Sequence, residues 1–185
     1  MTPGLMLGAA AGASCTWGSG DSALIDASGY SNNNWSAATG NTWWGQTITI
    51  PTSGSIITGC KIMMGDSNGS GSLVVELRDQ TTGDPGSNVL ATATIGNADI
   101  PISDSPAFVD VEFSSPYTTT SDNQLLSITG RAIDGPVYGG YFTLRYQSSG
   151  NPMSGGALHY SLNAGSSWTE RSNCDALSSI WGCTP

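Results

Sequence analysis

Apolar and polar residues alternate along most of this chain in short runs that are typical of β-strands. The clearest run is 73–78, where Leu73, Val75 and Leu77 share one face and the residues between them share the other. Turn residues separate the runs, so many short strands at near-regular spacing predict an all-β sandwich or barrel. The other expected strands are 43–50, 60–64, 89–95, 108–113 (with Val109, Val111 and Phe113 facing inward), 124–129 and 141–147.

Residues 155–169 predict a β-hairpin. The first half, 157–162, alternates between two faces, and residues 163–165 tolerate the positive φ that a tight turn requires. This alternation puts His159 on the polar face, where we expect an ordinary strand residue. Trp168 falls where the second strand returns across the first, and we expect it in the core.

Composition limits the architecture and the partners. A chain of 185 residues with 38% hydrophobic residues is expected to bury one core, and 25 glycines with only 10% charged residues favour strands joined by turns. The formal net charge of -9 would repel a nucleic-acid backbone. No apolar run of about 18 residues is present, so we expect no membrane span.

Residues 1–40 differ from the rest of the chain. Residues 1–13 are small and apolar but lack the basic leader of a secretory signal, and residues 15–40 are rich in Gly, Ser and Asn. We therefore expect an irregular N-terminal arm over 1–40, which packs on something else, and a sandwich over 41–185.

Motifs for metal binding are incomplete. Residues 66–71 begin like an EF-hand calcium loop, but the twelfth position is Leu77 where a bidentate acid is needed. A Gly-rich hairpin turn explains these residues better, while a structural calcium held by other loops stays open. The cysteines form no C-x-x-C pair and His159 is the only histidine, so we expect no metal site built from them and no cofactor. Residues 84–86, Asp-Pro-Gly, are read as a turn.

Catalytic arrangements are also weak. His159 has no G-x-S-x-G elbow beside it. Glu76 and Glu112 are the candidates for a facing pair of glycosidase carboxylates, but Arg78 follows Glu76 by two residues and a surface ion pair explains Glu76 more simply. We therefore expect a protein without enzymatic activity.

Aromatic side chains offer the best route to a ligand, because flat rings stack on sugars while staying partly exposed. Tyr138 and Tyr141 are preferred, since the glycines between them allow close approach. Trp181 is the third predicted binding residue. Trp35 and Tyr146 are further candidates.

The succession G-Q-T-I-T-I-P, L-V-V-E-L-R-D, F-V-D-V-E-F-S-S-P-Y and G-G-A-L-H-Y-S-L-N-A-G-S-S-W-T over residues 43–182 resembles a jelly-roll domain of bacterial surface proteins and phage structural proteins. This domain is similar in outline to carbohydrate-binding modules. The resemblance implies a jelly-roll β-sandwich. The family's last strand, D-x-A-F-R-V-Y-G, corresponds to residues 175–182, where Ser178 replaces the usual aromatic residue.

The possible disulfide pairings depend on whether residues 175–182 form an extended strand. Cys174 and Cys183 suggest a stapled loop, but an extended strand over 175–182 separates its ends by about 30 Å, too far for a disulfide. Terminal strands of a jelly roll often lie side by side, so the resemblance implies Cys15 as the partner of Cys183. Free buried thiols are the alternative.

Two functions follow. The first is a non-catalytic phage virion structural protein, either a capsid decoration (cement) protein or a tail component, which is a homo-oligomer and docks onto other virion proteins through residues 1–40. The alternative is a carbohydrate-binding or adhesion module of a secreted or cell-surface protein, with a cell-surface glycan as its ligand.

Overall fold

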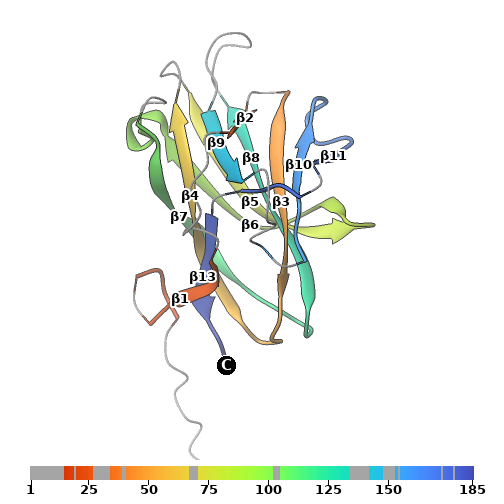
Figure 1. The fold of residues 1–185 in the computed structure, drawn as a ribbon. Helices are drawn as coiled ribbons and strands as arrows, with labels where there is room; N and C mark the ends of the chain where they lie inside the picture. Colours follow the sequence, from red (N-terminus) through yellow and green to blue (C-terminus); the bar gives the residue numbers. More distant parts are fainter. Residues whose placement is uncertain are drawn as a thin grey trace, which may run out of the picture.

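The part of the chain that the structure describes folds almost entirely into β-strands (Figure 1). This computed structural model describes residues 15–18, 20–26, 34–38, 41–66, 71–101, 105–133, 142–147, 153, 155–171, 173–176 and 178–185. A single turn of 3₁₀ helix at Asn97–Asp99 accompanies the strands of these ranges.

One sheet has six antiparallel strands. Its central pair is β3 and β8, which match Trp44 with Gly130 and Ile50 with Gln124 at the two ends of their register. The strands in spatial order are β11 (Thr169–Arg171), β10 (Leu158–Ser161), β3 (Trp43–Ile50), β8 (Gln124–Ile133), β5 (Ser72–Thr81) and β6 (Asp84–Gly96).

The second sheet has seven antiparallel strands arranged around β4 (Ile56–Asp66). β7 (Ala107–Thr118) pairs along one edge of β4, and β13 (Ser178–Cys183) and β9 (Phe142–Gln147) share the other edge. The remaining strands pair with these: β1 (Ser22–Asp26) with β13, and β2 (Asn34–Ala38) and β12 (Asp175–Ala176) with β9.

The core lies between the inner faces of the two sheets, so the predicted β-sandwich is confirmed. The predicted inward residues of β7, Val109, Val111 and Phe113, are all buried. Trp44 is buried in the same cluster, and its indole ring occupies the space that a Cβ at Gly130 would need. Each fully buried large apolar side chain contributes roughly 1.5–3 kcal/mol.

Two segments of the predicted N-terminal arm are not irregular. β1 pairs with β13 and β2 pairs with β9, so both strands extend the seven-stranded sheet. Leu24 and Ile25 of β1 also pack against the core. The sequence signal is weak there because β1 and β2 are short, and the sheet edge that they join determines their conformation.

Two predicted turns are wrong. The β5–β6 turn is formed by Thr82 and Gly83, both with positive φ (54° and 93°), and residues 84–86 begin the returning strand. A two-residue loop of this kind matches the twist of the paired strands. The expected hairpin at 66–71 is absent because β4 and β5 belong to different sheets. Residues 67–70 lie outside the described ranges.

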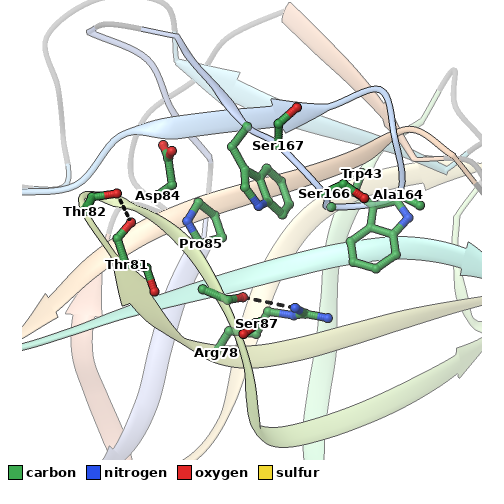
Figure 2. Close-up of a pocket in the computed structure, with 13 residues that line it drawn as sticks. Trp43, Arg78, Thr81, Thr82, Asp84, Pro85, Ser87, Ala164, Ser166 and Ser167 are labelled. Carbon is green, nitrogen blue, oxygen red and sulfur yellow. Dashed lines mark hydrogen bonds between the residues drawn. The ribbon is translucent and has the colours of Figure 1, made fainter.

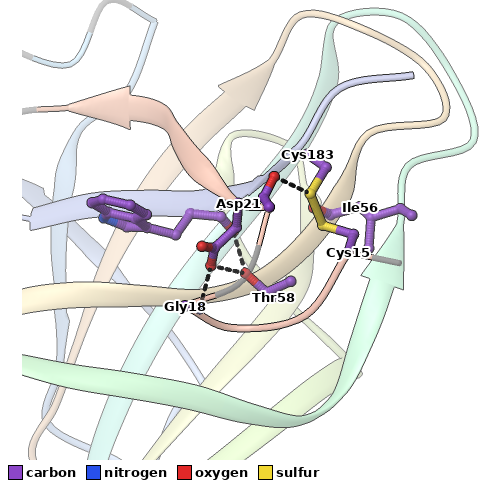
Figure 3. The surroundings of a disulfide bond; sticks show 8 residues. Cys15, Gly18, Asp21, Ile56, Thr58 and Cys183 are labelled. Atoms are coloured by element: carbon purple, nitrogen blue, oxygen red, sulfur yellow. Dashed lines mark hydrogen bonds between the residues drawn. A yellow bond between two sulfur atoms is a disulfide. The ribbon is translucent and has the colours of Figure 1, made fainter. Parts of the chain in front are cut away.

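A disulfide joins the two ends of the described chain. Cys15 and Cys183 form it, with a Cα–Cα distance of 6.0 Å (Figure 3). Beside it, the Thr58 hydroxyl donates a hydrogen bond to Asp21 Oδ2 (3.1 Å). Cys60 and Cys174 are free thiols, and β12 and β13 run between Cys174 and Cys183.

A buried carboxylate connects the two sheets. Asp175 of β12 accepts hydrogen bonds from Gln46 Nε2 of β3 (2.6 Å) and from the Met153 backbone N–H (3.0 Å). Gln46 Oε1 accepts in turn from the Ala176 N–H (2.7 Å). Burial raises the pKa of Asp175, and these hydrogen bonds partly oppose the shift.

Replacing Cys15 and Cys183 by serine is expected to lower the free energy of unfolding by about 2–5 kcal/mol, because the bridge closes a loop that spans nearly the whole chain. Urea unfolding of the oxidised protein, with Cys174→Ser as the matched control, measures the change. Equal midpoints for the double variant and the control would contradict the prediction.

Asp175→Asn is expected to lower the free energy of unfolding by about 1–3 kcal/mol. Both carboxylate oxygens accept hydrogen bonds, so an amide would turn its NH₂ group toward one of the two donors. The exposed Asp110→Asn, which makes the same chemical change on β7, serves as the control and should change stability far less. Equal losses in the two variants would show that this buried network has no special role.

Candidate functional site

A groove on the described surface lies between two hairpin tips on the six-stranded sheet. Residues 81–87 of the β5–β6 hairpin form one wall, and residues 164–168 between β10 and β11 form the other (Figure 2). Trp43 of β3 and Arg78 of β5 complete the lining. The groove has a volume of about 640 Å³, which is within the usual range for small-molecule sites.

Backbone conformation brings the two tips together. β5 pairs with β8 only as far as Asp79, and beyond this residue the hairpin no longer pairs with β8. At this point Asp79 links β5 to β6, because its carboxylate accepts hydrogen bonds from the Asn88 N–H (3.1 Å) and Nδ2 (2.6 Å). Across the groove, the predicted turn is confirmed by positive φ at Ala164 (55°) and Gly165 (79°).

Gly45 of β3 lets the tips pack down on the sheet. A Cβ at this position would lie 2.8 Å from Pro85 Cγ and 3.1 Å from Trp168 Cζ3. Pro85 and Trp168 come from opposite walls, so both walls contact the same point of the sheet's outer face. Any larger residue at position 45 would push the walls outward.

Two indole rings form the apolar part of the groove. Trp43 and Trp168 meet edge to face with their centroids 6.4 Å apart, and both are half-buried. The expectation that Trp168 belongs to the core is therefore wrong. It lies on the outer face of the six-stranded sheet, because the turn at 163–165 carries it past the inner layer.

A buried ion cluster supports the aromatic floor. Glu76 accepts from Arg78 Nε (2.8 Å) and Nη2 (2.5 Å), and from Arg131 Nη2 (3.2 Å). Both guanidinium groups lie 5.4 Å from the centre of the Trp43 ring. The predicted Glu76–Arg78 pair is present, but Glu76 is buried and a second arginine joins it.

His159 lies under the wall formed by the β5–β6 hairpin. Its side chain is 2% exposed, and Nδ1 is 3.3 Å from Oδ1 of Asp84, whose own side chain is 46% exposed. Within the described residues, neither ring nitrogen of His159 has a hydrogen-bond partner. Burial lowers the pKa of His159, while the charges of Asp84 and Glu170 oppose the shift.

The sequence-predicted binding residues that the structure describes do not line this groove. Tyr138 and Tyr141 fall outside the described residues, as does the side chain of Trp35. Trp181 projects from β13 next to Trp17 (centroids 6.3 Å apart), with Lys61 Nζ 4.9 Å from its ring, on the other sheet. Tyr146 is buried, and its hydroxyl accepts from Arg171 Nη1 (2.7 Å).

The sequence predicts other roles for two of the groove residues. It predicts Trp168 in the core and Asp84 in a turn. A signal for the groove does exist, because a tryptophan next to a turn and an Asp-Pro pair at a strand start both mark exposed hairpin tips. The sequence alone does not indicate that the two tips meet.

Other chemistry finds little support in the described part of the chain. Glu76 and Glu112 lie in different sheets, so they do not form a facing pair. The described ranges contain no group of three or more His, Cys, Asp or Glu side chains arranged to hold a metal ion. In those ranges, no helix has the length and apolar character to cross a membrane.

Comparison with known proteins does not assign the groove a role. The sequence matches no protein-family model and no curated protein.

Stability is expected to fall as the pH drops below about 6.5, partly because of His159. Its pKa is lower in the folded state, so the unfolded chain binds more protons in this range and protonation favours unfolding. His159→Gln should lose this component, and its free energy of unfolding should change less between pH 7.5 and 5 than that of the wild type. Urea unfolding at both pH values measures this change in the free energy of unfolding. An identical change in the wild type and in His159→Gln would show that His159 does not contribute to the pH dependence of stability.

Proposed function

We propose that this chain is a glycan-binding module of an extracellular or cell-surface protein, with the sugar bound in the groove between the two hairpin tips. The observation that carries the proposal is the combination of half-buried indole rings with exposed polar groups in one groove.

The lining suits a sugar chemically. The Trp168 ring provides an apolar surface for the C–H face of a pyranose. Ser166, Ser167 and Thr82 provide hydroxyl groups, and Asp84 provides a carboxylate, all of which can exchange hydrogen bonds with sugar hydroxyls. The groove is therefore apolar on the floor and polar at the rim, as in many small-ligand sites.

The groove is also preorganised. Trp43 is held by Trp168 and by two arginines that Glu76 fixes in place, so little side-chain freedom is lost when a ligand binds. Gly45 and the Asp79–Asn88 contacts hold the tips at a fixed separation.

The disulfide supports a location outside the reducing cytosol. Structural disulfides persist in secreted proteins and on cell and virion surfaces.

A virion structural protein that docks through residues 1–40 stays a prediction. Residues 1–14 lie outside the described ranges, and β1 and β2 use their backbones to pair with β13 and β9 of the same chain. The glycan proposal is preferred because a specific groove supports it.

Trp168→Ala is expected to lower the retention of glycan on a broad array of surface oligosaccharides by at least about tenfold, which corresponds to 1.4 kcal/mol. The matched control is Trp181→Ala, which removes a half-buried tryptophan from the other sheet and should leave retention unchanged. Thermal unfolding confirms that both variants are folded. The proposal fails if the wild type retains no glycan, or if the two variants behave alike.

A further inference from the structure

Asp84 holds an unusual position at the groove. Its carboxylate lines the groove and is half-exposed, while its Oδ1 atom lies 3.3 Å from the buried His159 ring. One side of this carboxylate therefore faces the protein, and the other faces the space where a ligand would bind.

We propose that Asp84 is the carboxylate that accepts hydrogen bonds from the ligand, that His159 positions it, and that the groove consequently selects neutral sugars over acidic ones. This inference rests on the glycan-binding function proposed above.

The charges around the groove support this selectivity. Arg78 directs Nε and Nη2 to Glu76 and Nη1 to the Gly86 carbonyl (3.1 Å), and Arg131 also donates to Glu76. Arg78, which lines the groove, is therefore engaged by protein acceptors, and Arg131 does not line the groove. Asp84 adds a negative charge at the rim, and the chain as a whole carries -9.

His159 limits the positions that this carboxylate can adopt. Its buried ring occupies the space next to Oδ1 of Asp84 without a hydrogen bond to it, and its strand partner on β3 is Gly45. The charged groups that face it are Asp84 from β6 and Glu170 from β11. The neutral ring leaves the acceptor capacity of Asp84 to the ligand.

Protonation would change this arrangement. An imidazolium under Asp84 would form a charge-assisted hydrogen bond with it and compete with the sugar hydroxyls. The ring gains its proton below its ordinary pKa of about 6.5, since burial lowers the value. Ligand affinity is therefore expected to decrease as the pH falls from 7.5 toward 5.

The test uses an array of neutral, sialylated and sulfated oligosaccharides, followed by calorimetric titration of the best-retained neutral one. We expect neutral glycans to dominate. Asp84→Asn should lower affinity at least tenfold, whereas Asp110→Asn, which removes the same charge from the other sheet, should not. His159→Gln should flatten the pH profile of affinity between pH 7.5 and 5, which a purely structural role would not do.

The possible results distinguish failure of this inference from failure of the proposed glycan-binding function. If no glycan of any class is retained, both this inference and the proposed function are overturned. If acidic glycans are preferred, or if Asp84→Asn binds like the wild type, the inference is overturned while the groove remains a glycan site. An unchanged pH profile in a folded His159→Gln variant overturns the positioning role.

Discussion

The rest of the structure depends on the C-terminal segment that contains β12 and β13. β13 pairs with both β4 and β1, and β12 pairs with β9, so one segment joins strands from distant parts of the chain. Asp175, the first residue of β12, also reaches the opposite sheet through Gln46. The sandwich is complete only when this last segment is in place, which makes its buried polar contacts as important as the apolar core.

The outer face of the six-stranded sheet is an unusual surface because it is polar and yet covered. Glu76, Thr129 and His159 are all nearly inaccessible although they point away from the core. Pro85 and Trp168 pack over Gly45 on this face, and the low exposure of Glu76 strengthens the ion cluster beside Trp43. The same coverage makes the groove firm, since its walls rest on a packed layer and not on mobile side chains.

Sequence reasoning recovered the strands whose inner faces alternate clearly, such as Val109–Phe113 in β7. It does not identify the outer faces of the strands. Leu73 through Leu77 are all buried, so the alternation of apolar and polar residues does not show which side of this strand faces solvent. β1 and β2 are not predicted because they are short and the sheet edges that they join determine their conformation. The groove is not predicted because its two walls are sequence-distant hairpins that meet over Gly45.

The bridge between Cys15 and Cys183 has a mechanical consequence. Every strand from β1 to β13 lies within the covalent ring that it closes. A pulling force applied to the chain on either side of this ring would pass from one sulfur to the other, and the sheets would carry almost none of it. The sheets can therefore stay folded while the chain outside this ring is under tension.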